Sequence, residues 1–301
     1  MFPIHALNKR PHSESYRGRF APSPSGLLHF GSLVAALASF LDAKHNDGKW
    51  LVRIEDIDPP REQIGASDKI LKTLEAYHLH WDEDVLYQSK QSDLYTEVIQ
   101  NLFANDLAYY CQCTRAQIKK LGGIYQGHCK NLDLPSNDSA IRLVNNTPVS
   151  EFFDKIQGHV KCDEALARED FTIFRKDGLF AYQLAVTVDD IFQGITHVVR
   201  GCDLLEPTAR QLSFFSALKV SAPQYSHIPL AITEQGYKLS KQNKAPAIDN
   251  KNPVPSIISA LNFLGQQPPK ALLESTCEEV IGWAIKYWSI DAVPKVKEIT
   301  L

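Results

Sequence analysis

A histidine between two glycines is the first feature of this sequence that could do chemistry. Gly26 and Gly31 are separated by four residues, as in a phosphate-binding P-loop, and His29 lies between them. A P-loop continues with Lys and then Ser or Thr, whereas Ser32 and Leu33 follow here. A glycine at a helix start lets the backbone approach a charged ligand, and a histidine there can donate to phosphate oxygens. We expect a nucleotide loop; the alternative is a strand-to-helix turn with a packed histidine.

A pair of lysines late in the chain is the second candidate. Lys238 and Lys241 lie three residues apart in the polar stretch GYKLSKQNKAP. An isolated pair of this kind usually belongs to a solvated loop. Combined with the histidine loop, a functional role for the pair is favoured over a solvated loop.

Three clustered cysteines form the third candidate. Cys111, Cys113 and Cys129 fall within 19 residues. Three thiolates in a reduced compartment suit Zn²⁺, which usually takes four ligands. Spacing alone offers His128 as the fourth ligand, although adjacent residues rarely reach one tetrahedral ion together; buried free thiols are the alternative. The remaining cysteines stand alone and are expected to be packing residues: Cys162, Cys202 and Cys277.

The first third of the chain alternates between strand and helix patterns. Residues 16–23 and 49–57 read as strands, and the helical spacing of apolar residues predicts helices over 31–46, 66–79 and 91–106. Strand, glycine-bearing turn, helix and strand make a βαβ unit with a parallel sheet. Ligands bind such sheets at the carboxyl ends of the strands. The histidine loop is expected there.

The alternation of strand and helix patterns is interrupted after residue 110 and returns later in the chain. Residues 111–137 are rich in Cys, Gly and polar residues, and short strands are predicted over 140–144 and 170–175. The βα pattern returns over 180–201, and the later elements are a helix over 205–218, a strand over 225–232 and a helical tail over 253–289.

The predicted fold is α/β, a Rossmann-like parallel sheet with helices on both faces, interrupted by a zinc-binding insertion and followed by a short helical C-terminal tail. We expect four segments: the first half of the catalytic domain (1–110), the insertion (111–170), the second half with the lysine loop (171–250) and a helical C-terminal region (251–301).

Composition sets the broad class. The 301 residues are 44% hydrophobic and 22% charged, which favours a folded chain with a sizeable core. No run approaches the roughly 18 apolar residues of a membrane span, and the N-terminal stretch MFPIHALNKRPHSES lacks a signal-peptide core. We therefore expect a soluble, cytoplasmic protein with no membrane partner. The net charge of −3 gives no global sign of nucleic-acid binding but leaves room for a local basic patch.

The histidine and lysine loops together resemble the two signatures of class I aminoacyl-tRNA synthetases. HFGS stands where that family has His-x-Gly-His, and KLSKQ stands where it has Lys-Met-Ser-Lys-Ser. The departures are Ser32 and Gln242. Five stretches resemble the glutamyl branch in its order, over about 19–242: RFAPSPSGLLHFGS, LVRIEDIDPPRE, AYQLAVTVDD, VVRGCDLLEPTARQ and KLSK.

This resemblance implies a glutamate pocket. Arg19 would pair with a carboxylate, Glu55 would accept the substrate ammonium, and Tyr182 and Arg200 would complete the pocket. Taken singly, these residues could equally be a salt-bridged arginine, a capping glutamate and a core tyrosine. The implied glutamate-binding set is Arg19, Phe20, Ala21, Pro22, Ser23, Glu55, Tyr182 and Arg200.

The resemblance also implies sites for ATP and zinc. His29, Gly31 and Lys241 would be catalytic, and Mg²⁺ is expected with the ATP. The ATP-binding set is His29, Gly31, Ser32, Lys238 and Lys241. The family pattern Cys-x-Cys-x11-Tyr-x3-Cys implies one structural Zn²⁺ held by Cys111, Cys113, Tyr125 and Cys129.

The number of residues after Lys241 bears on which RNA group is expected to accept glutamate. Sixty residues follow Lys241, where full glutamyl-tRNA synthetases have a large helical anticodon-binding region. The chain in this respect resembles the stand-alone glutamyl-queuosine tRNA(Asp) synthetases, and the implied partners are ATP, L-glutamate and the queuosine-bearing anticodon stem-loop of tRNA(Asp). The implied reaction forms glutamyl-adenylate and transfers glutamate to queuosine.

Three alternatives are kept open. The first is a minimal glutamyl-tRNA synthetase that charges a tRNA 3′ end. The second is a non-catalytic paralogue that binds RNA or glutamate, and the third is a small-molecule nucleotidyltransferase with the same histidine loop.

Overall fold

Two short parallel sheets lie side by side at the centre of the molecule. The computed structural model describes residues 15–237 and 246–301. One sheet has the order β1-β2-β3 and the other pairs β9 with β10, all in parallel. The Thr196 amide joins them by donating to the Arg17 carbonyl at 3.0 Å. The strands therefore run β3-β2-β1-β9-β10 across the molecule, and the sequence order reverses between β1 and β9.

The elements of this core follow the predicted alternation. The strands are β1 (Arg17–Phe20), β2 (Lys49–Ile54), β3 (Leu86–Tyr87), β9 (His197–Gly201) and β10 (Gln224–Ile228). The helices are α2 (Phe30–His45), α3 (Ala66–Ala76), α4 (Ser92–Ala104), α7 (Tyr182–Phe192) and α8 (Thr208–Ala217). The expected α/β fold with a parallel sheet is confirmed.

Alternation along the strands gives the sheet one apolar and one partly charged face. Trp50 and Val52 of β2 belong to the core that contains α2, whereas Leu51 packs with Val198 on the other side. Successive strand residues point to opposite faces. Arg53 therefore lies on the face opposite Trp50, where its ion-pair partners Asp189 and Asp190 are supplied by α7.

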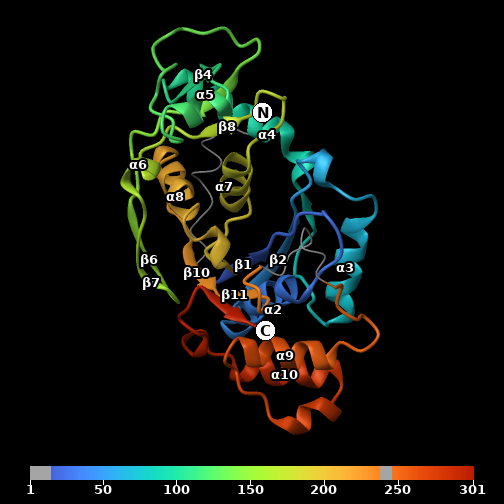
Figure 1. Ribbon diagram of the computed structural model, residues 1–301. Helices are drawn as coiled ribbons and strands as arrows, with labels where there is room; N and C mark the ends of the chain where they lie inside the picture. Colours follow the sequence, from blue (N-terminus) through green and yellow to red (C-terminus); the bar gives the residue numbers. More distant parts are fainter. Residues whose placement is uncertain (1–14, 238–245) are drawn as a thin grey trace.

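Helix α2 is almost fully enclosed, which explains its composition. Leu33 to Ala43 are buried without interruption except for Ala35. On its far side, α9 (Val254–Phe263) and α10 (Cys277–Tyr287) pack against it. A helix that is apolar on all sides is stable only between two layers. Figure 1 shows α9 and α10 at the end of the molecule opposite β4 and α5.

Residues 108–174 build two antiparallel units. β4 (Ala108–Cys111), β5 (Ala140–Leu143) and β8 (Thr172–Phe174) form one sheet, and β6 (Glu151–Asp154) pairs with β7 (Gly158–Lys161) as a hairpin. The short helices α5 (Arg115–Lys120) and α6 (Glu164–Ala167) flank them. The Lys155 amide donates to the Tyr225 carbonyl at 2.9 Å, so the hairpin lies beside β10.

The structure divides one predicted strand and contains several strands that were not predicted. The strand expected over 225–232 is divided into β10 and β11 (Leu230–Ile232), because Pro229 has no N–H for a ladder. β11 pairs instead with β12 (Glu298–Thr300), a strand beyond the predicted helical tail. The predicted helix over 205–218 begins later, as α8 at Thr208. Within the described ranges, no helix is long and apolar enough to cross a membrane.

Candidate active site

One cavity brings most of the predicted site residues together. It has a volume of about 740 Å³ and lies at the carboxyl ends of β1 and β9, where the strand order reverses. Eleven predicted residues line it: Arg19, Phe20, Ala21, Pro22, Ser23, His29, Gly31, Ser32, Glu55, Tyr182 and Arg200. Lys238 and Lys241 lie outside the residues that the structure describes.

His29 is fixed at the start of α2. It is the N-cap residue of this helix, and its Nδ1 accepts a hydrogen bond from the Ser32 amide at 3.3 Å. Because Nδ1 is the acceptor, a neutral ring carries its proton on Nε2. The first turn of α2 and the imidazole both border the cavity. This corner can therefore offer donors and a positive helix end to an anionic group.

Arg19 is held by a buried ion pair. Its Nε and Nη2 donate to the two carboxylate oxygens of Asp190 at 3.1 and 3.3 Å. Asp190 also pairs with Nη1 of Arg53 at 2.8 Å. All three side chains are 4% exposed or less, so each charge depends on its partners for compensation.

A second carboxylate completes this network. Asp189 lies 3.8 Å from Nε of Arg53 and accepts hydrogen bonds from Gln88 and from the Tyr95 hydroxyl, both at 2.8 Å. Burial raises the pKa of Asp189 to about 6 despite the nearby Arg53. The buried charges thus comprise two arginines and two aspartates contributed by β1, β2 and α7.

Glu55 borders the cavity and has no ion pair within 4 Å among the described residues. Its amide donates to the Pro22 carbonyl at 3.1 Å, which holds the end of β2 against the loop after β1. Burial raises the pKa of Glu55 to about 7, although Arg53 and Arg19 oppose the shift. A cationic group entering the cavity would favour the ionised form.

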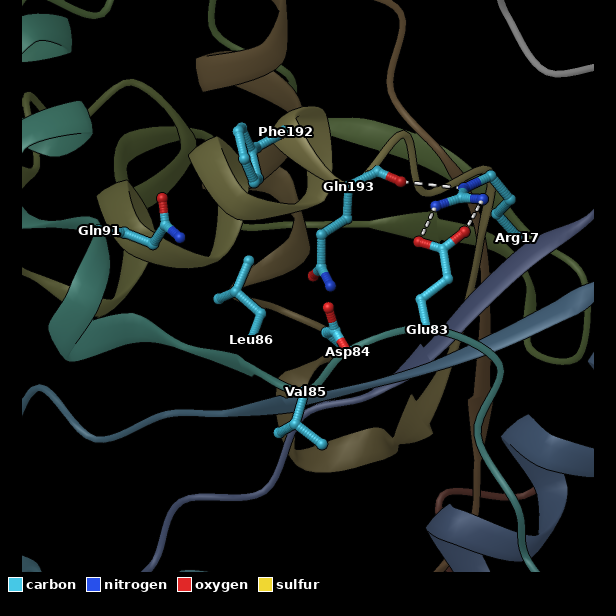
Figure 2. Close-up of a pocket in the computed structure, with 8 residues that line it drawn as sticks. All are labelled: Arg17, Glu83, Asp84, Val85, Leu86, Gln91, Phe192 and Gln193. Carbon is cyan, nitrogen blue, oxygen red and sulfur yellow. Dashed lines mark hydrogen bonds and ion pairs between the residues drawn. The ribbon is translucent and has the colours of Figure 1, made fainter.

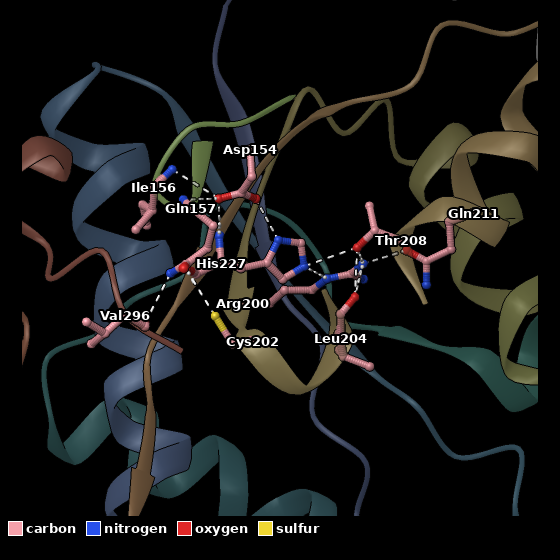
Figure 3. A network of polar contacts seen from close by, with 10 residues as sticks. All are labelled: Asp154, Ile156, Gln157, Arg200, Cys202, Leu204, Thr208, Gln211, His227 and Val296. Carbon is pink, nitrogen blue, oxygen red and sulfur yellow. Dashed lines mark hydrogen bonds and ion pairs between the residues drawn. The ribbon is translucent and has the colours of Figure 1, made fainter. Parts of the chain in front are cut away.

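Arg200 enters the cavity from β9 and is anchored from behind (Figure 3). Its Nη2 donates to Thr208 Oγ1 and to Gln211 Oε1, both at 2.8 Å, and its Nε donates to His227 Nε2 at 3.0 Å. The Tyr225 ring lies 5.0 Å from the guanidinium carbon. Nη1 is buried and has no hydrogen-bond partner among the described residues. The guanidinium is therefore oriented by neutral groups, and no carboxylate within the described ranges forms an ion pair with it.

Sequence reasoning missed the residues that support these side chains. They are Arg53, Asp154, Asp189, Asp190, Thr208, Gln211 and His227. A charged residue inside an apolar strand, such as Arg53 in LVRI, was a usable signal, and so was the Asp pair in VTVDDIF. A buried charge of this kind requires a partner.

A second cavity, of about 620 Å³, lies at the amino end of β1 (Figure 2). Arg17 and Glu83 form a bidentate pair across it, at 2.9 and 3.0 Å, and the remaining lining residues include Gln193 and Phe192. It contains none of the predicted site residues and lies away from the carboxyl ends where ligands of such sheets bind. We assign it no role in the chemistry.

The three clustered cysteines form a compact thiol group. The sulfur atoms of Cys111, Cys113 and Cys129 lie within 4.8 Å of one another, close enough to hold a metal ion. The Cys113 and Cys129 sulfurs are 3.5 Å apart. Tetrahedral Zn–S bonds of about 2.3 Å place two sulfurs about 3.8 Å apart, so the spacing fits that geometry.

A tyrosine hydroxyl, rather than a histidine ring, lies beside the three sulfur atoms. The Tyr125 hydroxyl accepts from the Cys129 amide at 2.8 Å and lies within hydrogen-bonding reach of the Cys111 and Cys129 thiols. His128 is exposed and is absent from the thiol group in the described part of the chain. Arg142 donates to the Cys111 sulfur at 3.2 Å and provides a cation beside it.

Comparison with known proteins assigns the chain to a family. Residues 15–270 match the family model described as tRNA synthetases class I (E and Q), catalytic domain. The chain is 64% identical to the glutamyl-Q tRNA(Asp) synthetase of Colwellia psychrerythraea, over 95% of this chain and 94% of that protein. It is 52% identical to the protein of that name from Escherichia coli K12, over 98% and 96%.

Solved structures of glutamate-tRNA synthetases are similar in fold to this chain. A glutamate-tRNA synthetase from Elizabethkingia anophelis matches with a TM-score of 0.77 and 26% identity, over 94% of this chain and 67% of that one. A glutamate tRNA ligase from Elizabethkingia meningosepticum, crystallised with its amino acid, matches equally well over 94% and 66%. This chain thus spans about two thirds of those longer chains.

The buried ion network predicts a large loss of stability when its central anion is removed. Asp190→Asn leaves Arg19 and Arg53 without full compensation in a buried site. We expect the free energy of unfolding to fall by about 3 kcal/mol or more, measured by urea denaturation at neutral pH.

Glu83→Gln is the matched control, because Glu83 is paired with Arg17 and Lys49 at the surface. Partly exposed pairs contribute little, so a loss of at most about 1 kcal/mol is expected. Equal losses in the two variants would contradict the view that the buried network carries this stability.

Proposed function

Since this chain belongs to the class I tRNA synthetases (E and Q), we propose that it is a ligase that activates glutamate with ATP and attaches it to tRNA. Relatives that are 52–64% identical bear the name glutamyl-Q tRNA(Asp) synthetase. The acceptor we propose is therefore queuosine in the anticodon of tRNA(Asp). The observation that carries the proposal is the single cavity in which two anchored arginines, Glu55, Tyr182 and the His29 corner meet.

The amino-acid end of the cavity suits a dicarboxylate with an ammonium group. Arg19 and Arg200 supply fixed guanidinium donors, and Glu55 supplies an anion for the ammonium. Tyr182 and the stretch from Phe20 to Ser23 border the same space. This supports glutamate as substrate, because each of its three charged groups finds a side chain of opposite charge.

The His29 corner suits the phosphates of ATP. Nε2 of His29 and the amino end of α2 can stabilise charge that develops at the α-phosphate. Gly31 and Ser32 border the same corner. Lys238 and Lys241 are proposed to act on the phosphates from the loop outside the described residues. Mg²⁺ bound with ATP would neutralise part of the phosphate charge.

The proposed reaction has two steps. A carboxylate oxygen of glutamate attacks the α-phosphorus in line, the bond to the bridging oxygen breaks, and pyrophosphate leaves. A hydroxyl of the acceptor then attacks the carbonyl carbon of the adenylate, loses its proton, and AMP leaves. The residues of this cavity contribute by holding the reactants in register and by compensating charge.

The cysteine group is proposed to hold one structural Zn²⁺, with Cys111, Cys113, Cys129 and Tyr125 as ligands. Its support is the sulfur spacing and the Tyr125 hydroxyl beside the thiols. The group lies in the β4–β5 region rather than at the strand ends that border the cavity. Zinc there would stabilise the fold of this segment.

A pH profile tests the role of Glu55. Its carboxyl is neutral below a pKa of about 7 and cannot then pair with the substrate ammonium. We expect kcat/KM for glutamate, measured by ATP–pyrophosphate exchange without RNA, to fall about tenfold per pH unit below pH 7 and to level off above it. Glu55→Gln should lower kcat/KM and remove the inflection.

The control is Glu62→Gln, which neutralises a raised-pKa carboxyl of the same loop that is not among the residues lining the cavity. This variant should keep the wild-type profile. An unchanged inflection in Glu55→Gln would remove Glu55 from the ammonium site.

Elemental analysis tests the zinc proposal. We expect about one Zn²⁺ per chain, loss of the metal in Cys113→Ser, and weaker loss in Tyr125→Phe, because three thiolates remain there. Cys162→Ser is the control, since this cysteine is not part of the thiol group. A metal-free wild-type protein with unchanged melting temperature would show that the thiols are only packed.

Labelled-glutamate transfer tests the acceptor. Transfer should require queuosine, proceed on an isolated anticodon stem-loop of tRNA(Asp), and tolerate removal of the 3′-terminal adenosine. Queuosine-free tRNA(Asp) is the control. Glutamate found on the 3′ end of a glutamate tRNA, and never on the modified anticodon, would instead establish the minimal synthetase.

A further inference from the structure

A histidine and an aspartate lie behind Arg200, outside the cavity wall (Figure 3). His227 of β10 and Asp154 of β6 are both completely buried, and His227 Nδ1 lies 2.6 Å from Asp154 Oδ2. The other ring nitrogen, Nε2, accepts from Nε of Arg200 at 3.0 Å. The three side chains form a line from the β6–β7 hairpin to the cavity.

The hydrogen bonds determine which ring nitrogen carries the proton. An arginine Nε always carries its hydrogen, so His227 Nε2 must present a lone pair to it. The proton of the neutral ring is therefore on Nδ1, where Asp154 accepts it. The Thr208 oxygen also lies 3.2 Å from His227 Nε2, but its hydroxyl donates to the Leu204 carbonyl at 2.7 Å, so Arg200 Nε remains the donor to this ring nitrogen.

Asp154 is itself firmly held. Its Oδ1 accepts from the amides of Ile156, Gln157 and His227 at 2.9 to 3.1 Å. Burial would raise the pKa of Asp154, but the bonds from His227 and the amides hold it below its usual value. Burial also lowers the pKa of His227 to about 4 despite Asp154. The pair is thus an anion and a neutral ring at neutral pH.

We propose that His227 and Asp154 are positioning residues for the substrate carboxylate, acting through Arg200. This rests on the proposed function of the cavity. Asp154 fixes the Nδ1–H tautomer of His227, and the Nε2 lone pair then fixes the guanidinium plane of Arg200. With Nε and Nη2 engaged, the guanidinium of Arg200 is held at the wall of the cavity, where its charge is available to the carboxylate. The amino-acid pocket consequently depends on a hairpin outside the parallel sheet.

Two substitutions at position 227 separate positioning from simple packing. In His227→Asn the amide nitrogen can replace Nδ1 and keep the bond to Asp154, but the acceptor for Arg200 is lost. In His227→Gln the side-chain oxygen can replace Nε2 and keep the bond from Arg200, while the bond to Asp154 is lost.

Glutamate-dependent ATP–pyrophosphate exchange without RNA provides the readout. His227→Asn should raise the KM for glutamate about 10- to 100-fold, the effect of losing one hydrogen bond to a charged group. Its KM for ATP and its kcat should stay near wild type. His227→Gln should keep a KM for glutamate closer to wild type and melt at a lower temperature.

Cys202→Ala is the control, because its buried thiol contacts only the His227 carbonyl among the groups of this network. It should leave the KM for glutamate unchanged. A KM that rises more in His227→Gln than in His227→Asn, or equally in both, would overturn the positioning role. No exchange with wild type or Cys202→Ala would instead refute the proposed function.

A measurement on the wild-type protein tests the same inference without any variant, in case the variants do not fold. Nitrogen NMR of the histidine-labelled chain should show His227 as the neutral Nδ1–H tautomer at neutral pH. The Nε2–H tautomer, or a charged ring, would overturn the inference.

Discussion

The shared carboxylate of Asp190 is the interaction on which the site depends most. It compensates Arg19 and Arg53 at once, in a space where none of the three is more than 4% exposed. A buried guanidinium without a partner is strongly destabilising, so the position of Arg19 is determined by α7 and not by β1 alone. These ion pairs connect β1, β2 and α7, and they hold the side chain of Arg19 in place at the cavity. A ligand carboxylate can then meet donors that are already oriented.

Arg200, on β9, is held by hydrogen bonds to uncharged groups rather than by an ion pair. Neutral acceptors, namely Thr208, Gln211 and His227, occupy two of its nitrogens, and the carboxylate of Asp154 is separated from it by the imidazole of His227. Arg200 therefore keeps its charge largely available to the cavity, whereas Arg19 shares its charge with Asp190. Glu55 adds a carboxyl whose pKa is raised by burial, with Asp190 and Asp189 adding to the shift. A dicarboxylate with an ammonium group would supply a carboxylate to pair with Arg200 and a cation to pair with Glu55.

Much of the fold followed from local patterns in the sequence. The short apolar run in KWLVRI and the helical spacing of apolar residues after Gly31 predicted β2 and α2, because these segments carry a local sequence signal of their own. The division at Pro229 and the pairing of β12 with β11 were not predicted, since three-residue strands have too few residues for a period and depend on long-range pairing. The residues predicted for the cavity do lie together, and their chemical roles remain predictions. The supporting layer, Asp190 and His227 among it, could not be assigned, because which buried charges meet is decided by tertiary packing.

The central claim is that fixed arginines and Glu55 prepare the cavity for glutamate before ATP or RNA binds. Isothermal titration calorimetry of the free protein with glutamate and with glutamine tests it directly, because the two differ by one carboxylate in place of one amide. The account predicts that glutamate binds at least about 100-fold more tightly, since the amide cannot pair with a guanidinium and would leave buried donors without an anion. Equal affinities for the two amino acids would contradict it.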